Sequence, residues 1–441
     1  HSSIFRPFQL QASGHDLMVI SALDGPPSNF RDDTDADAAP VYLETEQTNR
    51  HTVTIFYSTG WSRPMLHYTT NLEYGKWRSA PFVDADAHDR RWKVVTIQVS
   101  HPPSRTPAIE FTITDGSGMW DHPAGRNEGN YLIEDPGTYT LQNGYVETVP
   151  RLDPFLVVGD LEGTLVGNQE SMMAFKSYWD LMAKPQGAKL VYCSGRSLSQ
   201  YKELRDLSGG DQKGGNLVIP DGLILGLGTK VYFWHPTRLA WTEDLHWSAR
   251  LDYGWDLQQV REAAYRALAA VGRDNVMFRP PEEQNEHKIT LGVRDDVLLE
   301  VQEVIKECLL AAGVEAKIIS SGAGSWRFVD IIALRAGKAE ATDYCRYVMG
   351  FAKHRTLTCG YSESDISLLV EGTKVVIVGN AQQALKTWAR EKRDLGCLPQ
   401  DTIFAERVVA FGVMEGIRDL GLDPALGSFP GAIYLLDAPR P

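Results

Sequence analysis

The hydrophobic pattern changes character twice along the chain. Between residues 41 and 149, short runs alternate apolar and polar positions, are rich in Val, Thr, Ile, Tyr and Phe, and are separated by turn clusters. Alternation with a period of two is typical of half-buried strands, so this region predicts an all-β sandwich of about 100 residues. The runs cover residues 51–59, 64–70, 92–100, 108–115 and 138–149.

After residue 152 the strand-like runs become almost continuously apolar and alternate with amphipathic helical segments. Apolar strands separated by helices predict a parallel sheet covered on both faces, as in Rossmann-like α/β folds. We assign residues 152–233 and 335–425 to this core. The expected strands are 154–160, 188–195, 217–228, 354–360 and 373–380, and the expected helices include 171–184 and 197–208.

Residues 234–334 interrupt this pattern and predict an inserted α+β cap, suited to cover a site at the edge of the sheet. Residues 1–40 combine acidic residues, Pro and small polar groups without apolar periodicity, which predicts a disordered leader. Residues 426–441 are the expected C-terminal tail. Within the cap, helices are expected at 256–271 and 295–313, and strands at 286–293, 315–322 and 327–334.

Composition narrows the class of protein. An apolar content of 43% and a charged content of 23% are typical of soluble globular proteins. No apolar run approaches the roughly 20 residues that span a bilayer, so we expect no membrane partner. The net charge of −13 argues against nonspecific nucleic-acid binding. The five cysteines lack metal or disulfide spacing, which favours reduced thiols in an intracellular compartment.

Four polar residues follow expected strands or open an expected helix. Ligands bind at the carboxyl ends of parallel strands, so these residues are expected on one rim of the sheet. Asp160, in "VVGDLEGTLV", is the candidate nucleophile that would form an aspartyl-phosphate. Ser194 would hold a phosphoryl oxygen, Lys338 would stabilise developing negative charge, and Asp365 would lie near a metal. Each of these residues alone could instead be a helix cap, part of a turn or a solvated side chain. The occurrence of all four in this order along the chain favours a catalytic role.

Residues 155–420 resemble the haloacid dehalogenase (HAD) superfamily, and within it the sucrose-phosphate phosphatase type, whose α+β cap follows the third strand. The resemblance implies a Mg²⁺-dependent phosphatase of phosphorylated sugars. It also implies that Asp160 is the nucleophile, that Glu162 takes the acid/base position, that Ser194 binds phosphate and that Lys338 stabilises it. The matching stretches are "GDLEGTL", "CSGRSLSQY", "IPDGLILGLGTKVYF", "RAGKAEATDY", "CGYSESDISLL", "VIVGNAQQALKTWA" and "ERVVAFGVMEGI".

Two departures from the family pattern bear on activity. Glu162 stands where the family has Asp. In the family this position ligates Mg²⁺ through its backbone carbonyl, so the longer side chain affects the placement of the proton donor more than the binding of the metal. Tyr361 replaces a carboxylate that ligates Mg²⁺, and a neutral phenol is a poor ligand for a hard cation. The implied metal set is therefore Asp160, Glu162 and Asp365, with Glu363 as a candidate replacement. An altered but active site and a retired one stay open.

The β region has its own resemblance, to starch-binding carbohydrate modules of family 25, across residues 53–146. Its Tyr-x-x-Gly-Trp, His-Tyr, Gly-x-Trp and Asp-Gly-…-Trp-Asp elements occur in the family order. The resemblance implies that His67, Trp77 and Trp120 form a surface for starch or another α-glucan, with Trp61 as a helper or a core residue. Burial of these aromatics in the sandwich is the alternative. The Trp residues lie in turn segments, which favours ligand binding.

Two hypotheses follow. The first is a starch-binding sugar phosphatase, whose substrate is a phosphorylated sugar, with His287 and Lys288 of the cap as candidate sugar contacts or solvated edge residues. The second is a scaffold or regulator on starch that retains only the phosphatase fold. Starch binding is consistent with a plastid location. The chain begins at His1 rather than Met, which leaves open whether a transit peptide was removed.

Overall fold

The computed structural model describes residues 17–20, 50–85, 91–100, 107–126, 128–149, 152–207, 216–322, 324–369, 372–424 and 426, with the backbone alone described for 17–20 and 50. The chain divides into two compact units. The α/β unit comprises His1–Pro26, Pro154–Met173 and Ala188–Gly416. The β-rich unit comprises Pro27–Asp153, Ala174–Gly187 and Ile417–Pro441.

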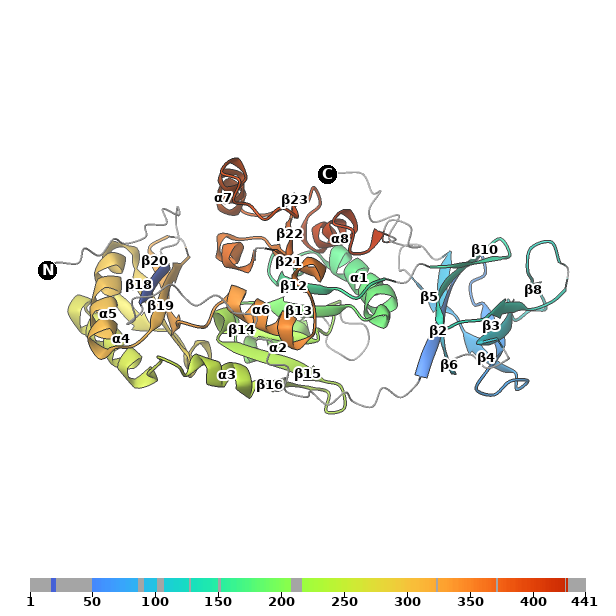
Figure 1. Ribbon diagram of the computed structural model, residues 1–441, viewed down its shortest axis with the longest axis horizontal. Helices are drawn as coiled ribbons and strands as arrows, with labels where there is room; N and C mark the ends of the chain where they lie inside the picture. The colour runs from blue at the N-terminus through green and yellow to red at the C-terminus, as the bar shows by residue number, and fades with distance from the viewer. Residues whose placement is uncertain are drawn as a thin grey trace. The chain divides into compact units, whose positions relative to one another are not determined.

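The α/β unit is built on an eight-stranded sheet with the order β16-β15-β14-β13-β12-β21-β22-β23 (Figure 1). The six strands from β14 to β23 are parallel, which confirms the predicted parallel core. Their bounds are β12 (Leu156–Asp160), β13 (Lys189–Cys193), β14 (Gly222–Leu225), β21 (Thr356–Gly360), β22 (Lys374–Ile377) and β23 (Thr402–Phe404). Strands β12, β13, β14 and β21 are buried almost throughout, which explains their continuous apolar runs.

An antiparallel hairpin, which the sequence pattern did not predict, extends the sheet beyond β14. It consists of β15 (Lys230–His235) and β16 (Ala240–Glu243), whose residues are mostly half-buried or exposed. The helices are α1 (Gln169–Tyr178), α2 (Leu198–Leu207), α3 (Leu245–Leu251), α6 (Lys338–Val348), α7 (Gln383–Asp394) and α8 (Val409–Asp419). None of the described helices combines the length and the apolar composition that a membrane crossing requires.

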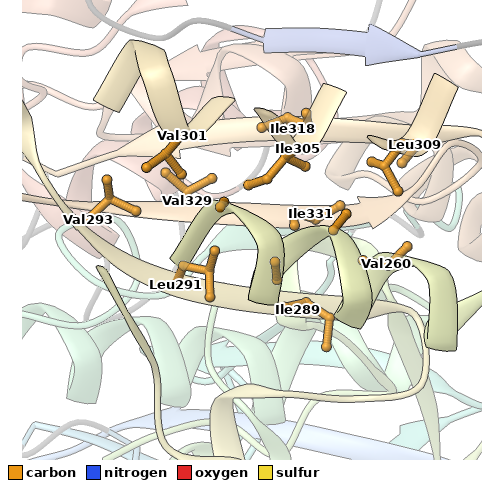
Figure 2. Close-up of a cluster of buried hydrophobic side chains, with 14 of the residues drawn as sticks. Val260, Ile289, Leu291, Val293, Val301, Ile305, Leu309, Ile318, Val329 and Ile331 are labelled. Carbon is orange, nitrogen blue, oxygen red and sulfur yellow. The ribbon is translucent and has the colours of Figure 1, made fainter. Parts of the chain in front are cut away.

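The cap has the predicted α+β composition. Two long helices, α4 (Leu257–Val271) and α5 (Leu298–Ala312), pack on one face of an antiparallel sheet (Figure 1). Figure 2 shows the apolar cluster between them, in which Val260, Ile305 and Leu309 meet Leu291 and Ile331 of the strands. The strands are β17 (Val276–Phe278), β18 (Lys288–Arg294), β19 (Ala316–Ser321) and β20 (Trp326–Ala333).

A short strand from the N-terminal segment completes the cap sheet. Strand β1 (Leu17–Ile20) pairs antiparallel with β19, so that Leu17 lies opposite Ile319 and Ile20 opposite Ala316. This strand lies inside segment 1–40, for which the sequence predicted disorder; the rest of that segment is outside the described residues. The cap sheet therefore contains a strand that is about 300 residues away from its partner in sequence.

The β-rich unit contains two sheets that share one hydrophobic cluster. Val53 and Ile97 of the first sheet and Leu66 and Phe111 of the second are buried in this cluster. The first sheet consists of β11 (Tyr145–Thr148), β10 (Gly137–Gln142), β2 (Arg50–Ser58), β6 (Trp92–Ser100) and β5 (Val83–Asp84). The second consists of β4 (Arg78–Pro81), β3 (Met65–Thr70), β7 (Ile109–Thr114) and β8 (Trp120–Asp121), and β9 (Tyr131–Ile133) also pairs with β7.

The cap cluster gives a matched test of packing within one helix. Leu309 is 0% exposed and its neighbour Leu310 is 50% exposed. We expect Leu309→Ala to lower the free energy of unfolding by about 2–5 kcal/mol, because it leaves a cavity between α5 and the cap sheet. Leu310→Ala is the control and should change it by less than about 0.5 kcal/mol. Urea denaturation followed by Trp fluorescence measures both, and equal effects would contradict the assignment of α5's buried face.

Candidate active site

Lys338 connects two carboxylates at the rim of the core sheet. Its Nζ lies 3.2 Å from Oδ1 of Asp160, at the end of β12, and 2.6 Å from Oδ1 of Asp365, in the loop after β21. All three side chains are buried. Strands β12 and β21 are parallel neighbours, so their carboxyl ends deliver both acids to the same edge. The structure thus brings together three of the residues that the sequence predicted for one site.

Asp365 is held by its own loop as well as by Lys338. Its Oδ2 accepts hydrogen bonds from the backbone N–H groups of Tyr361 (3.0 Å) and Ser362 (2.8 Å) and from the Ser362 hydroxyl (3.1 Å). The bond from the Ser362 N–H is one half of a capping box at the start of the 3₁₀ helix η7 (Glu363–Leu368); in the other half the Asp365 N–H donates to the Ser362 side chain. Both carboxylate oxygens of Asp365 therefore already have strong donors.

The burial of these charges shifts their proton affinities. Burial raises the pKa of Asp160 to about 7; Lys338 opposes this shift, while the charges of Asp365 and Glu162 add to it. Burial alone would lower the pKa of Lys338, but Asp365 and Asp160 outweigh it and hold the pKa well above its usual range. Burial opposes ionisation of Asp365 too, yet Lys338 and the loop N–H groups keep its pKa below the ordinary value. The stable charged pair is therefore Lys338 with Asp365.

Ser194 and Glu162 lie on the loops that follow β13 and β12. The Ser194 hydroxyl is buried and accepts a hydrogen bond of 3.2 Å from the backbone N–H of Arg196. The Arg196 guanidinium forms an ion pair with Glu162, through its Nε. Arg196 belongs to "CSGRSLSQY", but the sequence does not reveal its role, because the direction of an arginine side chain after a turn depends on its contacts in the fold. The structure gives Glu162 a cationic partner at the rim.

The turn after Asp160 is shaped by two residues from the C-terminal half of the core. The Asn380 amide donates to the Gly163 carbonyl (2.8 Å), and its oxygen accepts from the Val409 N–H (2.8 Å). The ring of Tyr361 covers Gly163 so closely that a Cβ at this glycine would lie 2.6 Å from Tyr361 Cγ. Asn380 lies in "VIVGNAQQALKTWA", which carried the family resemblance, but its bridging role depends on long-range contacts that a sequence pattern does not reveal.

The described residues do not fit a carboxylate-lined Mg²⁺ site. Both oxygens of Asp365 are occupied by donors, and the pairing of the Glu162 side chain with Arg196 leaves only the backbone carbonyl of Glu162 for a metal. Tyr361 packs on Gly163, and Glu363 is half-buried in the first turn of η7. Within the described parts of the chain, no group of three or more His, Cys, Asp or Glu side chains is arranged to hold a metal ion. The Mg²⁺ that the family resemblance implies is therefore not supported by this arrangement.

The two candidate sugar contacts of the cap have different environments. His287 is 2% exposed, and its Nε2 lies 2.8 Å from Oδ1 of the exposed Asp252; its contact with a sugar stays a prediction. Lys288 is also buried and lies 3.3 Å from Asp330. Its Cδ lies 4.0 Å from the position that a Cβ on Gly226 would take, which places Lys288 beside a loop of the core.

In the β-rich unit, three of the four predicted carbohydrate-binding residues form one cluster. His67 stacks on Trp77, with ring centres 5.1 Å apart and an angle of 18° between the ring planes. The ring centres of His67 and Trp120 lie 6.0 Å apart in an edge-to-face arrangement. Both Trp side chains are exposed. Trp61 does not join them; it packs on the hydrophobic cluster and contacts Tyr57 at 6.2 Å.

Comparison with known proteins places these residues in context. The family model of Sucrose-6F-phosphate phosphohydrolase matches residues 153–421. The probable sucrose-phosphatase 3a of Arabidopsis thaliana is 28% identical over 287 residues, which cover 63% of this chain and 62% of that protein. The chain thus spans less than two thirds of that relative. The mannosylfructose-phosphate phosphatase of Agrobacterium fabrum is 26% identical over 275 residues, covering 61% of this chain and 98% of that protein.

A solved structure, the sucrose-phosphatase from Synechocystis sp. PCC6803 in complex with sucrose and phosphate, has 27% sequence identity to the chain. The match covers 60% of this chain and 98% of that one, with a TM-score of 0.49. The family match begins at residue 153, so the two sheets of the β-rich unit lie outside it.

The buried ion pairs predict a large effect of removing Lys338. Lys338→Met leaves two buried carboxylates without a cation, so we expect the free energy of unfolding to fall by about 3–5 kcal/mol. Without the cation, both folded-state pKa values lie above the unfolded values, so the deficit should shrink as the pH is lowered from 8 to 5. Lys202→Met, at an exposed position of α2, is the control. Denaturation at both pH values measures the effect, and a deficit that does not change with pH would contradict it.

Proposed function

The chain belongs to the sucrose-6F-phosphate phosphohydrolase family through residues 153–421, and on this premise we propose that it is a sugar-phosphate phosphatase. The observation that carries the proposal is the contact of Lys338 with Asp160 at the carboxyl end of β12. A strand-end carboxylate beside a buried cation is the arrangement that attack on a phosphoryl group requires. The substrate proposed by family membership is a phosphorylated sugar, with sucrose 6-phosphate as the first candidate.

In the proposed reaction, an Asp160 oxygen attacks phosphorus, and the bond from phosphorus to the sugar oxygen breaks. The leaving sugar oxygen takes a proton from Glu162, and an aspartyl-phosphate remains. Water then attacks the phosphorus, gives its proton back to Glu162 and releases phosphate and the free Asp160 carboxylate. Lys338 neutralises charge on the phosphoryl oxygens, and the Ser194 hydroxyl positions them. Such charge stabilisation and positioning supply most of the catalysis in phosphoryl transfer.

The Arg196 ion pair bears on the proton transfer. Glu162 is one methylene longer than the family's Asp, and its pairing with Arg196 draws it toward the loop after β13. The guanidinium occupies a carboxylate oxygen of Glu162, so Glu162 has to separate from Arg196 to transfer a proton to the leaving oxygen. An incoming phosphate is a competing partner for Arg196, because guanidinium groups bind phosphate oxygens in pairs. Substrate binding would thereby free Glu162.

A second candidate function is a scaffold or regulator that retains the phosphatase fold. It is favoured by Tyr361, which covers Gly163 in place of a ligating carboxylate, and by Asp365, whose oxygens are already occupied. Turnover by the unmodified chain distinguishes the two functions, and a requirement for Mg²⁺ stays a prediction.

We further propose that the β-rich unit binds α-glucan. The supporting observation is the exposed cluster of Trp77, His67 and Trp120, because sugar rings present C–H faces that stack on indole rings. The Ser79 hydroxyl, 3.1 Å from His67 Nδ1, fixes the imidazole ring and leaves its other nitrogen for a sugar hydroxyl. Glucan binding would bring the phosphatase to starch, which is consistent with a plastid location.

The phosphatase proposal is tested by phosphate release from a panel of sugar phosphates that includes sucrose 6-phosphate, with and without Mg²⁺. We expect turnover by the unmodified chain and a loss of more than about 1000-fold in Asp160→Asn, because the nucleophile is lost. Tyr361→Asp with Glu162→Asp restores the family residues and should raise Mg²⁺-dependent turnover. If the unmodified chain releases no phosphate and only the restored variant does, the phosphatase proposal is refuted and the scaffold function is favoured.

The glucan proposal is tested by affinity electrophoresis in gels that contain starch or glycogen. Trp77→Ala and Trp120→Ala should each weaken binding by about threefold to tenfold, because each removes one stacking surface. Tyr145→Ala is the matched control, since Tyr145 is an exposed aromatic on β11 outside the cluster. An equal loss in all three variants, or no retardation of the unmodified chain, would argue against glucan binding by this surface.

A further inference from the structure

The residue that follows Glu162 is held at both of its backbone polar groups. The Gly163 N–H donates to the carbonyl of Val166 (2.8 Å), and the Gly163 carbonyl accepts from the side-chain amide of Asn380 (2.8 Å). The ring of Tyr361 lies against the same glycine. Gly163 has a φ of +74°, a conformation that glycine adopts without strain. The backbone next to Glu162 is therefore held by a side chain from a distant segment of the chain.

Asn380 is itself fixed, so that its amide group has one orientation. Its oxygen accepts a hydrogen bond of 2.8 Å from the N–H of Val409, the first residue of α8. A backbone N–H can only donate and a carbonyl can only accept, so the amide oxygen has to face Val409 and the nitrogen Gly163. The neighbouring Gly379 donates its N–H to the Arg407 carbonyl (2.7 Å), which ties the segment of Asn380 to the segment before α8.

The segment that contacts Asn380 carries backbone strain. Val409 has a φ of +47°, which is uncommon for any residue with a side chain and a clear outlier for a β-branched one. Such a conformation persists only where the surrounding contacts impose it. Here Asn380 binds the Val409 N–H, and the Glu415 carboxylate accepts from the N–H groups of Glu406 (3.0 Å) and Arg407 (2.9 Å). The strain therefore lies where the chain delivers an N–H group to Asn380.

Glu162 is thus held from two sides. Asn380 fixes the backbone beside it, and Arg196 binds its carboxylate. A glutamate side chain has one more rotatable bond than an aspartate, so its carboxylate can reach a defined position only if its backbone is fixed. The placement of this carboxylate relative to Asp160 decides whether the leaving oxygen receives a proton while its bond to phosphorus breaks.

We propose that Asn380 is a positioning residue for the proton transfer by Glu162: it holds Gly163 and thereby places the Glu162 carboxylate at the leaving sugar oxygen. This inference rests on the proposed phosphatase function. Asn380 does not touch the substrate. The proton passes from Glu162 to the leaving oxygen as the bond from that oxygen to phosphorus breaks, and the attacking water returns a proton to Glu162 in the second step. Loss of Asn380 therefore slows the cleavage of esters that need a proton donor and spares esters that do not.

The test compares kcat/KM for sucrose 6-phosphate with kcat/KM for p-nitrophenyl phosphate, because both values report on the formation of the aspartyl-phosphate. A sugar leaves as a strongly basic alkoxide unless it is protonated, whereas p-nitrophenolate is a weak base and leaves without a proton. Asn380→Ala should lower the value for sucrose 6-phosphate about tenfold to 100-fold and that for p-nitrophenyl phosphate less than about threefold. Asn380→Asp keeps the acceptor for the Val409 N–H, loses the donor to Gly163 and should show the same selectivity.

Two further variants exclude a general effect on the fold. In a Glu162→Gln background, Asn380→Ala should cause no additional loss on sucrose 6-phosphate, because the proton donor is already absent. Asn168→Ala is the matched control: Asn168 Oδ1 accepts from the Ser171 N–H (2.9 Å), so a comparable hydrogen bond is lost and the ratio of the two values should not change. Equal losses on both esters in Asn380→Ala, or an undiminished loss in the Glu162→Gln background, overturn the inference while the phosphatase proposal stands.

Failure of the proposed function has a different signature. If the unmodified chain hydrolyses neither ester, or Asp160→Asn retains turnover, the phosphatase proposal fails. Hydrogen exchange of the peptide 161–166, followed by mass spectrometry, then tests the contact itself, because the N–H groups of residues 163–166 donate to carbonyls of the same turn. Exchange that is faster in Asn380→Ala and Asn380→Asp, with β12 unchanged, supports the hold of Asn380 on Glu162. Unchanged exchange of the peptide overturns it.

Discussion

The burial of Lys338 between two carboxylates is the interaction on which the α/β unit depends. A buried ammonium without a partner costs several kcal/mol, so the chain has to hold Asp160 and Asp365 on either side of it. Three elements that are distant in sequence must therefore bring their residues to one place. They are the end of β12, the loop after β21 and the first turn of α6. The segment at Gly228 lies so close to the residue before Lys338 that a Cβ on Gly228 would lie 2.2 Å from the Gly337 carbonyl oxygen. Only glycine at 228 permits this approach.

The sequence predicted the parts of this arrangement that follow from local pattern. Strands such as β12 and β21 are buried on both faces, so their apolar runs are unmistakable, and the carboxyl ends of parallel strands meet at one edge. That reasoning was sufficient to bring Asp160, Lys338 and Asp365 together. It could not predict the pairing of Glu162 with Arg196 or the bridge made by Asn380, because these depend on side-chain directions and on contacts between distant segments.

Two further features could not be predicted from the sequence pattern, one because of partial exposure and one because of a specific contact. The β15–β16 hairpin has mixed burial, so its sequence lacks both the continuous apolar run of a central strand and a clear alternation. His287 immediately precedes β18 and is buried, but its Nε2 contacts the exposed carboxylate of Asp252, which the sequence did not predict. A histidine has no fixed preference for surface or core, so its partner decides its role.

The pairing of β1 with β19 changes how the chain can be divided. By sequence, the β-rich region looks like a separate module that precedes the phosphatase-like region, so that removal of the first 150 residues would seem to leave the second part intact. Such a truncation would also remove Leu17–Ile20 and expose the backbone of β19, whose sequence is "AKIISS". An uncovered edge strand is a template for pairing with other chains, and therefore for aggregation. Strand β1 thus protects an edge of the cap sheet, and a shortened chain needs β1 to remain attached.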